Sequence, residues 1–135
     1  MFVVDASVAM AWCFADEMSA YADRVLDRLE VEEAVAPAIW PLEIANGLRT
    51  AERRGRIDPG ELLRVRVLLR SLPVRVEAIE LEVALSEVLE VARAHDLTAY
   101  DAAYLALAAR RGLALATADD ALRRACQQAG IDLAT

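Results

Sequence analysis

Four acidic residues in this 135-residue chain stand alone in stretches that are otherwise uncharged. They are Asp5 in residues 1–15, Glu43 in residues 34–48, Asp101 in residues 98–109, and Asp119 directly after residues 112–118. Burying a lone carboxylate is costly unless another group compensates its charge. These acids are therefore the first candidates for a functional site, provided that the fold brings them together.

Carboxylates that converge on one crevice repel one another, and some stay protonated unless a cation joins them. An acid-rich, all-oxygen site suits a hard divalent ion such as Mg²⁺ or Mn²⁺. Zinc is disfavoured, because His95 is the only histidine and the two cysteines, Cys13 and Cys126, lie elsewhere. One or two such ions can activate water and stabilise the leaving oxygen of a phosphodiester, which predicts a metal-dependent phosphoryl hydrolase.

Helix capping is the alternative explanation for three of these acids. Asp5 can cap the apolar helix that it precedes, with Ser7 sharing the role. Glu43 lies in the first turns of its helix, where the macrodipole favours an acid. Asp101 follows Thr98 at the spacing of a capping box. A solvated cap does not need apolar neighbours on its helical face, yet Asp101 shares its face with apolar residues one and two turns later.

The fourth acid is ambiguous, because Asp119 and Asp120 are adjacent. Thr117 and Asp120 have the spacing of a second capping box, whereas Asp119 keeps a Thr-x-Asp spacing with Thr117. We prefer Asp119, with Asp120 as the alternative. Beside Glu43, the positions Asn46, Gly47 and Thr50 continue the same helical face and predict a small polar groove.

The elements that must position these acids are short apolar strands that alternate with helical patterns. The predicted strands are residues 2–4, 34–36, 74–78 and 113–117. The predicted helices are a short one after Asp5 and residues 17–33, 41–55, 58–72, 80–95, 98–112 and 118–130. This alternation predicts an α/β fold, a parallel sheet of four to five strands with helices on both faces. Sites in such sheets lie beyond the carboxyl ends of the strands, where Asp5 and Asp119 fall.

Composition favours one globular domain over residues 1–135, because 57% of the residues are hydrophobic and no linker divides the chain. The opening apolar stretch has no basic leader and carries Asp5, so we expect a soluble, cytoplasmic protein with no membrane association. The two cysteines are expected to be buried thiols.

The net charge is −7, yet all 15 basic residues are arginine and many cluster in residues 49–70. Arginine favours bidentate contacts to phosphate. A phosphate-binding surface and an ordinary solvated helix face are both open interpretations of this cluster. The helix at 58–72 also carries more apolar residues than one buried face needs, so it either covers a partner or packs between other helices.

Four motifs together resemble the PIN domain, and more closely the VapC-type toxins of toxin–antitoxin pairs. The motifs are "VVDASV", "PLEIANGL", "LTAYDAAYLALA" and "LATADDAL", which span the chain in the family's order. The resemblance implies a Rossmann-like sheet and a metal-dependent endoribonuclease. It also implies an RNA substrate, a small antitoxin that occupies the active-site groove, and a homodimer.

By the same resemblance, the catalytic acids that hold Mg²⁺ or Mn²⁺ would be Asp5, Glu43, Asp101 and Asp119. Ser7 and Thr117 fall at hydroxyl positions that often line such sites, and Asn46 is a further polar contact. The implied mechanism is in-line attack of activated water on an RNA phosphorus.

A binding module and a phosphatase are the two functions that compete with the nuclease. A catalytically weak PIN-like module that binds RNA or protein is disfavoured by the intact set of acids. A phosphatase with Asp5 as nucleophile is disfavoured, because such enzymes carry a second acid two residues later and a nearby lysine. Here position 7 is serine and the chain has no lysine.

Overall fold

The computed structural model describes all residues, Met1–Thr135, and contains a four-stranded parallel sheet in the order β3-β2-β1-β4. The strands are β1 (Phe2–Val4), β2 (Ala34–Pro37), β3 (Val74–Glu77) and β4 (Leu115–Ala116). Phe2 pairs with Ala34, and Val3 pairs with Leu115 on the other side. β1, β2 and β4 are fully buried, as expected of short apolar strands covered on both faces. The predicted parallel α/β sheet is confirmed.

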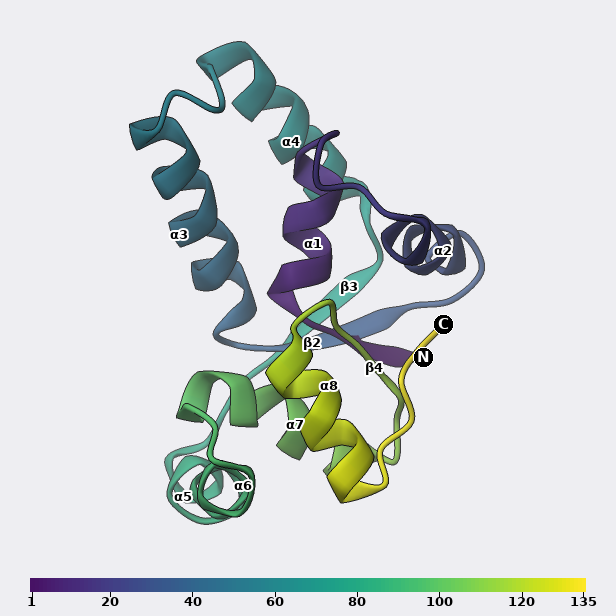
Figure 1. Cartoon of the computed structure of the whole chain (residues 1–135), viewed down its shortest axis with the longest axis vertical. Helices are drawn as coiled ribbons and strands as arrows, with labels where there is room; N and C mark the ends of the chain where they lie inside the picture. The colour runs from purple at the N-terminus through teal and green to yellow at the C-terminus, as the bar shows by residue number, and fades with distance from the viewer.

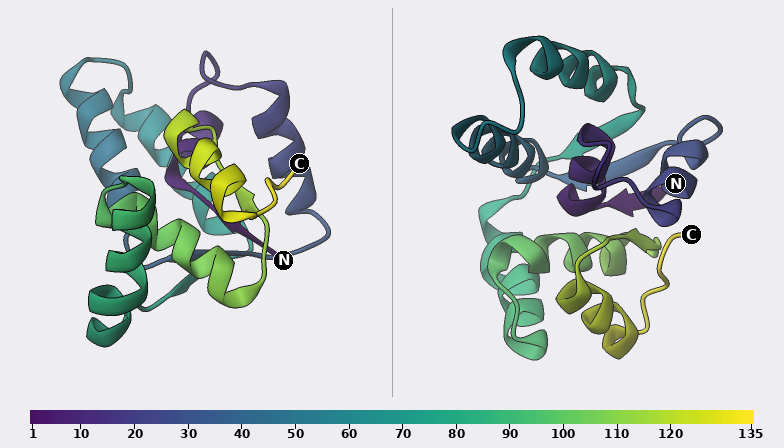
Figure 2. Two further views of the ribbon diagram at one scale, coloured as in Figure 1. Left: turned by 60° about the horizontal axis from the view of Figure 1, so that its bottom comes forward. Right: turned by 45° about the horizontal axis from the view of Figure 1, so that its top comes forward.

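Helices cover both faces of this sheet (Figures 1 and 2). They are α1 (Ala6–Cys13), α2 (Ala20–Arg28), α3 (Trp40–Arg53), α4 (Pro59–Ser71), α5 (Leu81–Val83), the π-helical η1 (Ala84–Val88), α6 (Leu89–His95), α7 (Ala99–Arg111) and α8 (Asp120–Ala129). Figure 2 shows α1 to α4 on one side of the sheet and α5 to α8 on the other. None of the helices is both long and apolar enough to cross a membrane.

Local capping explains where two helices differ from the pattern in the sequence. α2 begins later than the predicted residue 17, because the Ser19 side chain accepts a hydrogen bond from the Ala22 amide and caps the helix there. The predicted helix over residues 80–95 is a continuous run of α5, η1 and α6. Within it, the Ser86 hydroxyl donates to the carbonyl of Glu82, which competes with the regular backbone pattern.

The order of the strands reverses at β1 and β4, the point at which parallel sheets commonly form a crevice. The chain moves from β1 to β2 to β3 in one direction, and β4 then pairs with the free side of β1. Such a reversal opens a crevice beyond the carboxyl ends of the two strands. Asp5 follows β1 directly, and Thr117 follows β4. The topology therefore brings the first and last acidic motifs to one place.

Candidate functional site

Asp5 is almost fully buried, with 4% of its surface exposed. It occupies the N-cap position of α1, but its side chain makes no capping hydrogen bond, so the predicted cap is wrong. Its Oδ2 instead accepts hydrogen bonds from the Ser7 and Thr117 hydroxyls, each at 2.7 Å. Burial raises the pKa of Asp5, and these two hydrogen bonds oppose that rise.

The two hydroxyls also fix the turn that follows β4. Ser7 Oγ accepts from the Ala118 amide at 3.0 Å, and Thr117 Oγ1 accepts from the Asp119 amide at 3.1 Å. The Thr117 side chain is completely buried. Both residues that the resemblance placed at hydroxyl positions thus contact Asp5, and they tie the last acidic motif to it.

Glu43 lies in the first turn of α3 and is half-buried. Its Oε1 accepts a hydrogen bond of 2.6 Å from the hydroxyl of Tyr104 on α7. Burial raises the pKa of Glu43, the bond from Tyr104 lowers it, and the charges of Asp5 and Asp101 raise it further. Tyr104 was not predicted as a site residue.

Asp101 lies in the first turn of α7, where its amide donates to the Thr98 hydroxyl at 3.2 Å. The predicted cap of this helix by Thr98 is therefore confirmed. Burial raises the pKa of Asp101, and the negative charges of Asp119 and Asp5 raise it further. This acid thus shares a local electrostatic environment with two of the others.

Asp119 caps α8 through Oδ2, which accepts from the Leu122 amide at 2.9 Å. The predicted capping box of Thr117 and Asp120 is therefore wrong, because the Thr117 hydroxyl already donates to Asp5 and the helix begins later. The Asp119 charge raises the pKa of both Asp5 and Asp101. Asp120 contributes to neither shift.

The four predicted acids therefore lie close enough to one another to interact electrostatically, at the starts of α1, α3, α7 and α8. No arginine neutralises them, because none of the nine ion pairs in the structure includes any of the four. The structure contains no group of three acidic, histidine or cysteine side chains placed to hold one metal ion. The crevice is thus a cluster of uncompensated carboxylates.

Comparison with known proteins identifies the family. A model of the PIN domain matches residues 2–128. The chain belongs to the PIN-domain family. Its relatives include a VapC ribonuclease of Mycobacterium bovis and ribonuclease VapC9 of Mycobacterium tuberculosis, each 35% identical over 88% of this chain and 86% of the relative. The predicted resemblance is confirmed.

Solved structures of other proteins share this fold. The crystal structure of PAE2754 from Pyrobaculum aerophilum is 30% identical, with a TM-score of 0.69 over 92% of this chain and 83% of that one. FitAcB from Neisseria gonorrhoeae, 19% identical, has a TM-score of 0.67 over 100% of this chain and 97% of that one. A toxin–antitoxin complex from Klebsiella pneumoniae, 18% identical, has a TM-score of 0.62 over 88% of this chain and 87% of that one.

The prediction of a polar groove beside Glu43 is wrong at Gly47, where an apolar side chain fills the space. A Cβ atom there would lie 2.6 Å from Met10 Cε, so Gly47 allows α3 to pack closely against α1. Asn46 is exposed. The side chains that donate to the acids come from the turn after β4, from α1 and from α7, not from the rest of the α3 face.

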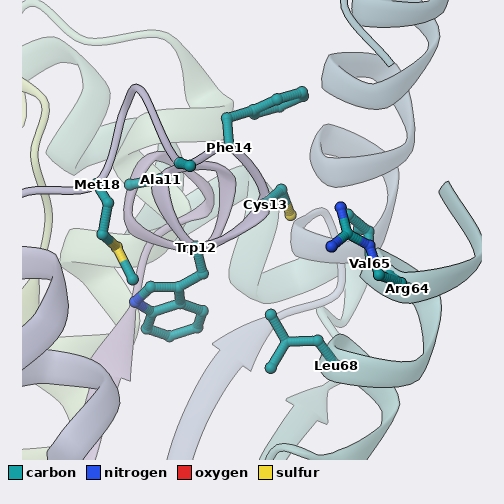
Figure 3. A pocket seen from close by; sticks show the side chains of 9 residues that line it. Ala11, Trp12, Cys13, Phe14, Met18, Arg64, Val65 and Leu68 are labelled. Carbon is teal, nitrogen blue, oxygen red and sulfur yellow. The ribbon is translucent and has the colours of Figure 1, made fainter. Parts of the chain in front are cut away.

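The PIN domain also has an apolar pocket of about 480 Å³ between the end of α1, the loop after it and α4 (Figure 3). Cys13, Trp12 and Met18 line one side, and Leu68 lies on the α4 side. Both cysteines are free thiols, and Cys126 is buried as predicted, whereas Cys13 is only half-buried. Partial or full burial raises the pKa of each to about 11. Such thiols are poor nucleophiles at neutral pH.

Proposed function

We propose that residues 1–135 form one PIN domain that acts as a metal-dependent endoribonuclease, the VapC-type toxin of a toxin–antitoxin pair. The observation that carries this proposal is the cluster of four carboxylates without a single arginine partner. The repulsion among such carboxylates is relieved by protonation or, at neutral pH, by an external cation. The names of the mycobacterial relatives support RNA as the substrate.

The donor set fits Mg²⁺ or Mn²⁺, because these ions bind through one or two carboxylates and retain several waters. We propose that Asp5, Glu43, Asp101 and Asp119 hold the ion or ions, some directly and others through water. When bound, the ion supplies a Lewis acid that stabilises charge on the phosphodiester and lowers the pKa of water.

The chain's own residues orient this site without neutralising it. Ser7 and Thr117 hold Asp5 through a single oxygen, which leaves Oδ1 without a side-chain donor. His95 lies at the end of α6, where its Nδ1 is 3.1 Å from Gln128 Oε1, and it therefore serves no proton transfer in the crevice. Acid–base chemistry would fall to water and the carboxylates.

Arginines on the α3–α4 hairpin would contact the RNA backbone. Residues 49–71 carry seven arginines and three acids in a chain whose net charge is −7. This hairpin extends away from the second half of the chain (Figure 1). Arg53 and Arg54 are exposed and form no ion pair. Arg54 lies on nearly the same side of the helix as Glu43 and roughly 16 Å further along the helix axis. One RNA strand could therefore contact both residues.

Neutralising these arginines tests the contact with RNA. Replacing Arg53 and Arg54 by Gln should raise KM for RNA several-fold and lower the salt dependence of binding, because each phosphate contact releases counterions. Replacing Arg93 and Arg124, which are also exposed and unpaired, is the matched control with the same change in net charge. Equal effects of the two double substitutions would show that the hairpin is not the contact surface.

The partners that we propose are a small antitoxin and a second copy of the chain. The toxin–antitoxin complex from Klebsiella pneumoniae has the same fold, and relatives carry the VapC name. α4 buries only Val65 fully and leaves Leu63 and Val67 exposed at 59% and 64%. The alternative that α4 packs between two other helices is therefore wrong, and its outer face is free for a partner.

The test of the nuclease uses the protein, purified without any partner, and total cellular RNA. With Mg²⁺ or Mn²⁺, discrete cleavage is expected, and excess EDTA should abolish it. Asp5→Asn and Asp119→Asn should each lower the rate about 100-fold or more, whereas Asp120→Asn is the matched control and should retain activity. If the folded protein binds the ion and leaves all RNA intact, the alternative of a catalytically weak binding module replaces the nuclease.

A further inference from the structure

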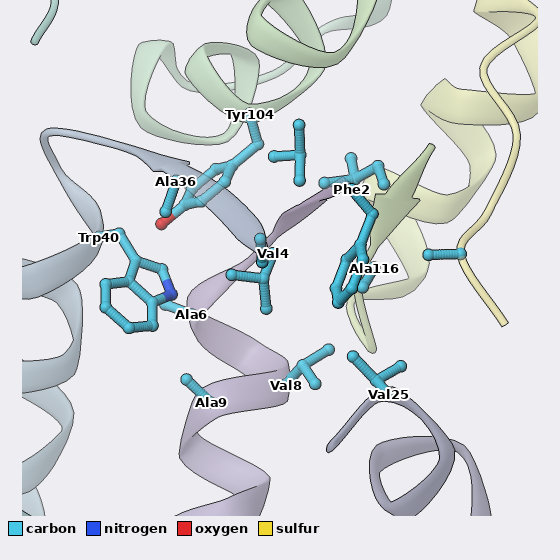
Figure 4. Close-up of a cluster of buried hydrophobic side chains, with 14 of the residues drawn as sticks. Phe2, Val4, Ala6, Val8, Ala9, Val25, Ala36, Trp40, Tyr104 and Ala116 are labelled. Carbon is cyan, nitrogen blue, oxygen red and sulfur yellow. The ribbon is translucent and has the colours of Figure 1, made fainter. Parts of the chain in front are cut away.

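Tyr104 connects the core of the fold to the acidic crevice. Its side chain is completely buried, and it points from α7 toward Ala36 and Trp40 in the core (Figure 4). Only its hydroxyl reaches the crevice, where it donates to Glu43 Oε1 at 2.6 Å. The two residues are 61 positions apart and belong to helices on opposite sides of the sheet. This is the only hydrogen bond that holds the Glu43 carboxylate.

The bond leaves half of the Glu43 carboxylate free. Oε1 receives the Tyr104 hydroxyl, while no protein donor contacts Oε2. Asp5 shows the same division, since Ser7 and Thr117 both donate to its Oδ2. Asp119 accepts the Leu122 amide through Oδ2 alone. In each of these three acids these hydrogen bonds reach one carboxylate oxygen, and the other accepts none from a side chain.

The alternative is that the hydrogen bond between Tyr104 and Glu43 is purely structural. A buried tyrosine hydroxyl needs an acceptor, and Glu43 could serve only to satisfy it. A backbone carbonyl or a neutral side chain would do this at lower cost, because a half-buried carboxylate that is repelled by Asp5 and Asp101 is a poor choice for a purely structural acceptor. A long glutamate side chain also loses rotamer freedom when it is fixed. The hydroxyl bond offsets this loss before any ligand arrives.

We propose that Tyr104 is a positioning residue for divalent-ion binding, which fixes Glu43 through Oε1 and presents Oε2 to the ion. This inference rests on the proposed metal-dependent function. Partners that orient a ligating carboxylate typically contribute 10- to 100-fold to metal affinity. Tyr104 itself does not touch the ion or the RNA.

The first experiment compares the affinity of Tyr104→Phe and the parent protein for Mn²⁺, measured from the paramagnetic resonance signal of the free ion. The phenylalanine ring keeps the packing of the tyrosine and removes only the hydroxyl. We expect the dissociation constant to rise about tenfold. Tyr100→Phe, on the same helix and 62% exposed, is the matched control and should bind as the parent does. Thermal unfolding without the ion verifies that each variant is folded.

A thermodynamic cycle with Glu43→Gln separates positioning from a general structural effect. If Tyr104 acts through Glu43, removing its hydroxyl in the Glu43→Gln background should change the Mn²⁺ affinity by less than about twofold. An equal loss in both backgrounds, or parental affinity of Tyr104→Phe, would overturn the inference. If Tyr104→Phe fails to fold, Glu43→Asp replaces it, because the shorter carboxylate cannot reach the hydroxyl, and parental affinity of Glu43→Asp would overturn the inference instead.

The same titration distinguishes this inference from the proposed function. If the parent protein binds no Mn²⁺ at millimolar concentration, the proposed metal site fails, and the role of Tyr104 fails with it. If the parent binds the ion and Tyr104→Phe binds it equally well, only the role of Tyr104 fails.

Discussion

Removing the Thr117 hydroxyl tests how the fold tolerates the buried charge of Asp5. Thr117→Val keeps the shape of the side chain and removes the hydroxyl that donates to Asp5 Oδ2 at 2.7 Å. Both side chains are buried, so water cannot easily replace the lost donor. Ser7 is then the only side chain that still donates a hydrogen bond to Asp5. The substitution therefore weakens the compensation of a buried carboxylate without creating a cavity.

The expected cost follows from the charge of the acceptor. A hydrogen bond to a charged group contributes about 1.5–3 kcal/mol, compared with about 1 kcal/mol for a neutral pair. The Asp119 amide, which also loses Thr117 Oγ1, belongs to an exposed residue and can bind water. We therefore expect Thr117→Val to lower the free energy of unfolding by about 2 kcal/mol. This corresponds to a decrease in Tm of roughly 5–10 °C for a chain of this length.

Urea denaturation at pH 7.5 in EDTA measures this cost for the parent and the variant. The same substitution in an Asp5→Asn background should cost about 1 kcal/mol, because the acceptor is then neutral. Ser7→Ala, at a half-exposed position where water can replace the donor, should cost less than Thr117→Val. A cost below about 0.5 kcal/mol, or an equal cost with and without the Asp5 charge, would refute the reasoning that the hydroxyl stabilises a buried carboxylate.

Two further predictions concern the same region. Burial raises the pKa of Asp5, Glu43 and Asp101 above their ordinary values of 3.8, 4.5 and 3.8. Each acid therefore contributes its full stabilisation below its ordinary pKa, and this contribution is lost as the pH rises through the pKa of the folded state. Without divalent ions, urea denaturation should show this loss above about pH 4, smaller in Asp5→Asn, and no such loss in the parent would contradict the shifts. Gly47→Ala gains about 1 kcal/mol in helix propensity and requires only the flexible end of the Met10 side chain to move. It should therefore stabilise the parent by less than about 1 kcal/mol and a Met10→Ala variant by about the full 1 kcal/mol, and destabilisation of the parent in urea denaturation would refute this account of the contact.

The sequence predicted the fold and the grouping of the acids because both leave local signals. Short apolar strands between amphipathic helices are visible without any tertiary information. A single acid in an apolar stretch is visible in the same way, and Asp5 at the end of β1 had only a few places to lie once the sheet was parallel. The topology then explains why Asp119, more than 100 residues later, lies near it.

The contacts that hold the acids left no such signal. Tyr104 in an apolar helix has the pattern of an ordinary core residue, and only the packing of α7 near the start of α3 shows its hydroxyl reaching Glu43. The capping pattern was ambiguous at Thr117, because one hydroxyl can serve either a helix amide or a carboxylate. Which of these it contacts depends on β1 and β4 being neighbours, a fact of tertiary structure.

The choice of partners around the acids connects stability to function. An arginine beside Asp5 or Glu43 would lower the pKa of the carboxylate and stabilise the folded protein, but it would also occupy the oxygens and cancel the charge. Hydroxyls orient a carboxylate and leave its charge in place. The protein without ions therefore keeps a repulsion that protonation at low pH or an external cation relieves, and a cation that binds the folded state alone stabilises it in proportion to the logarithm of its concentration. In the proposed metal site, the same charge that lowers the stability of the fold would be the source of its affinity for the ion.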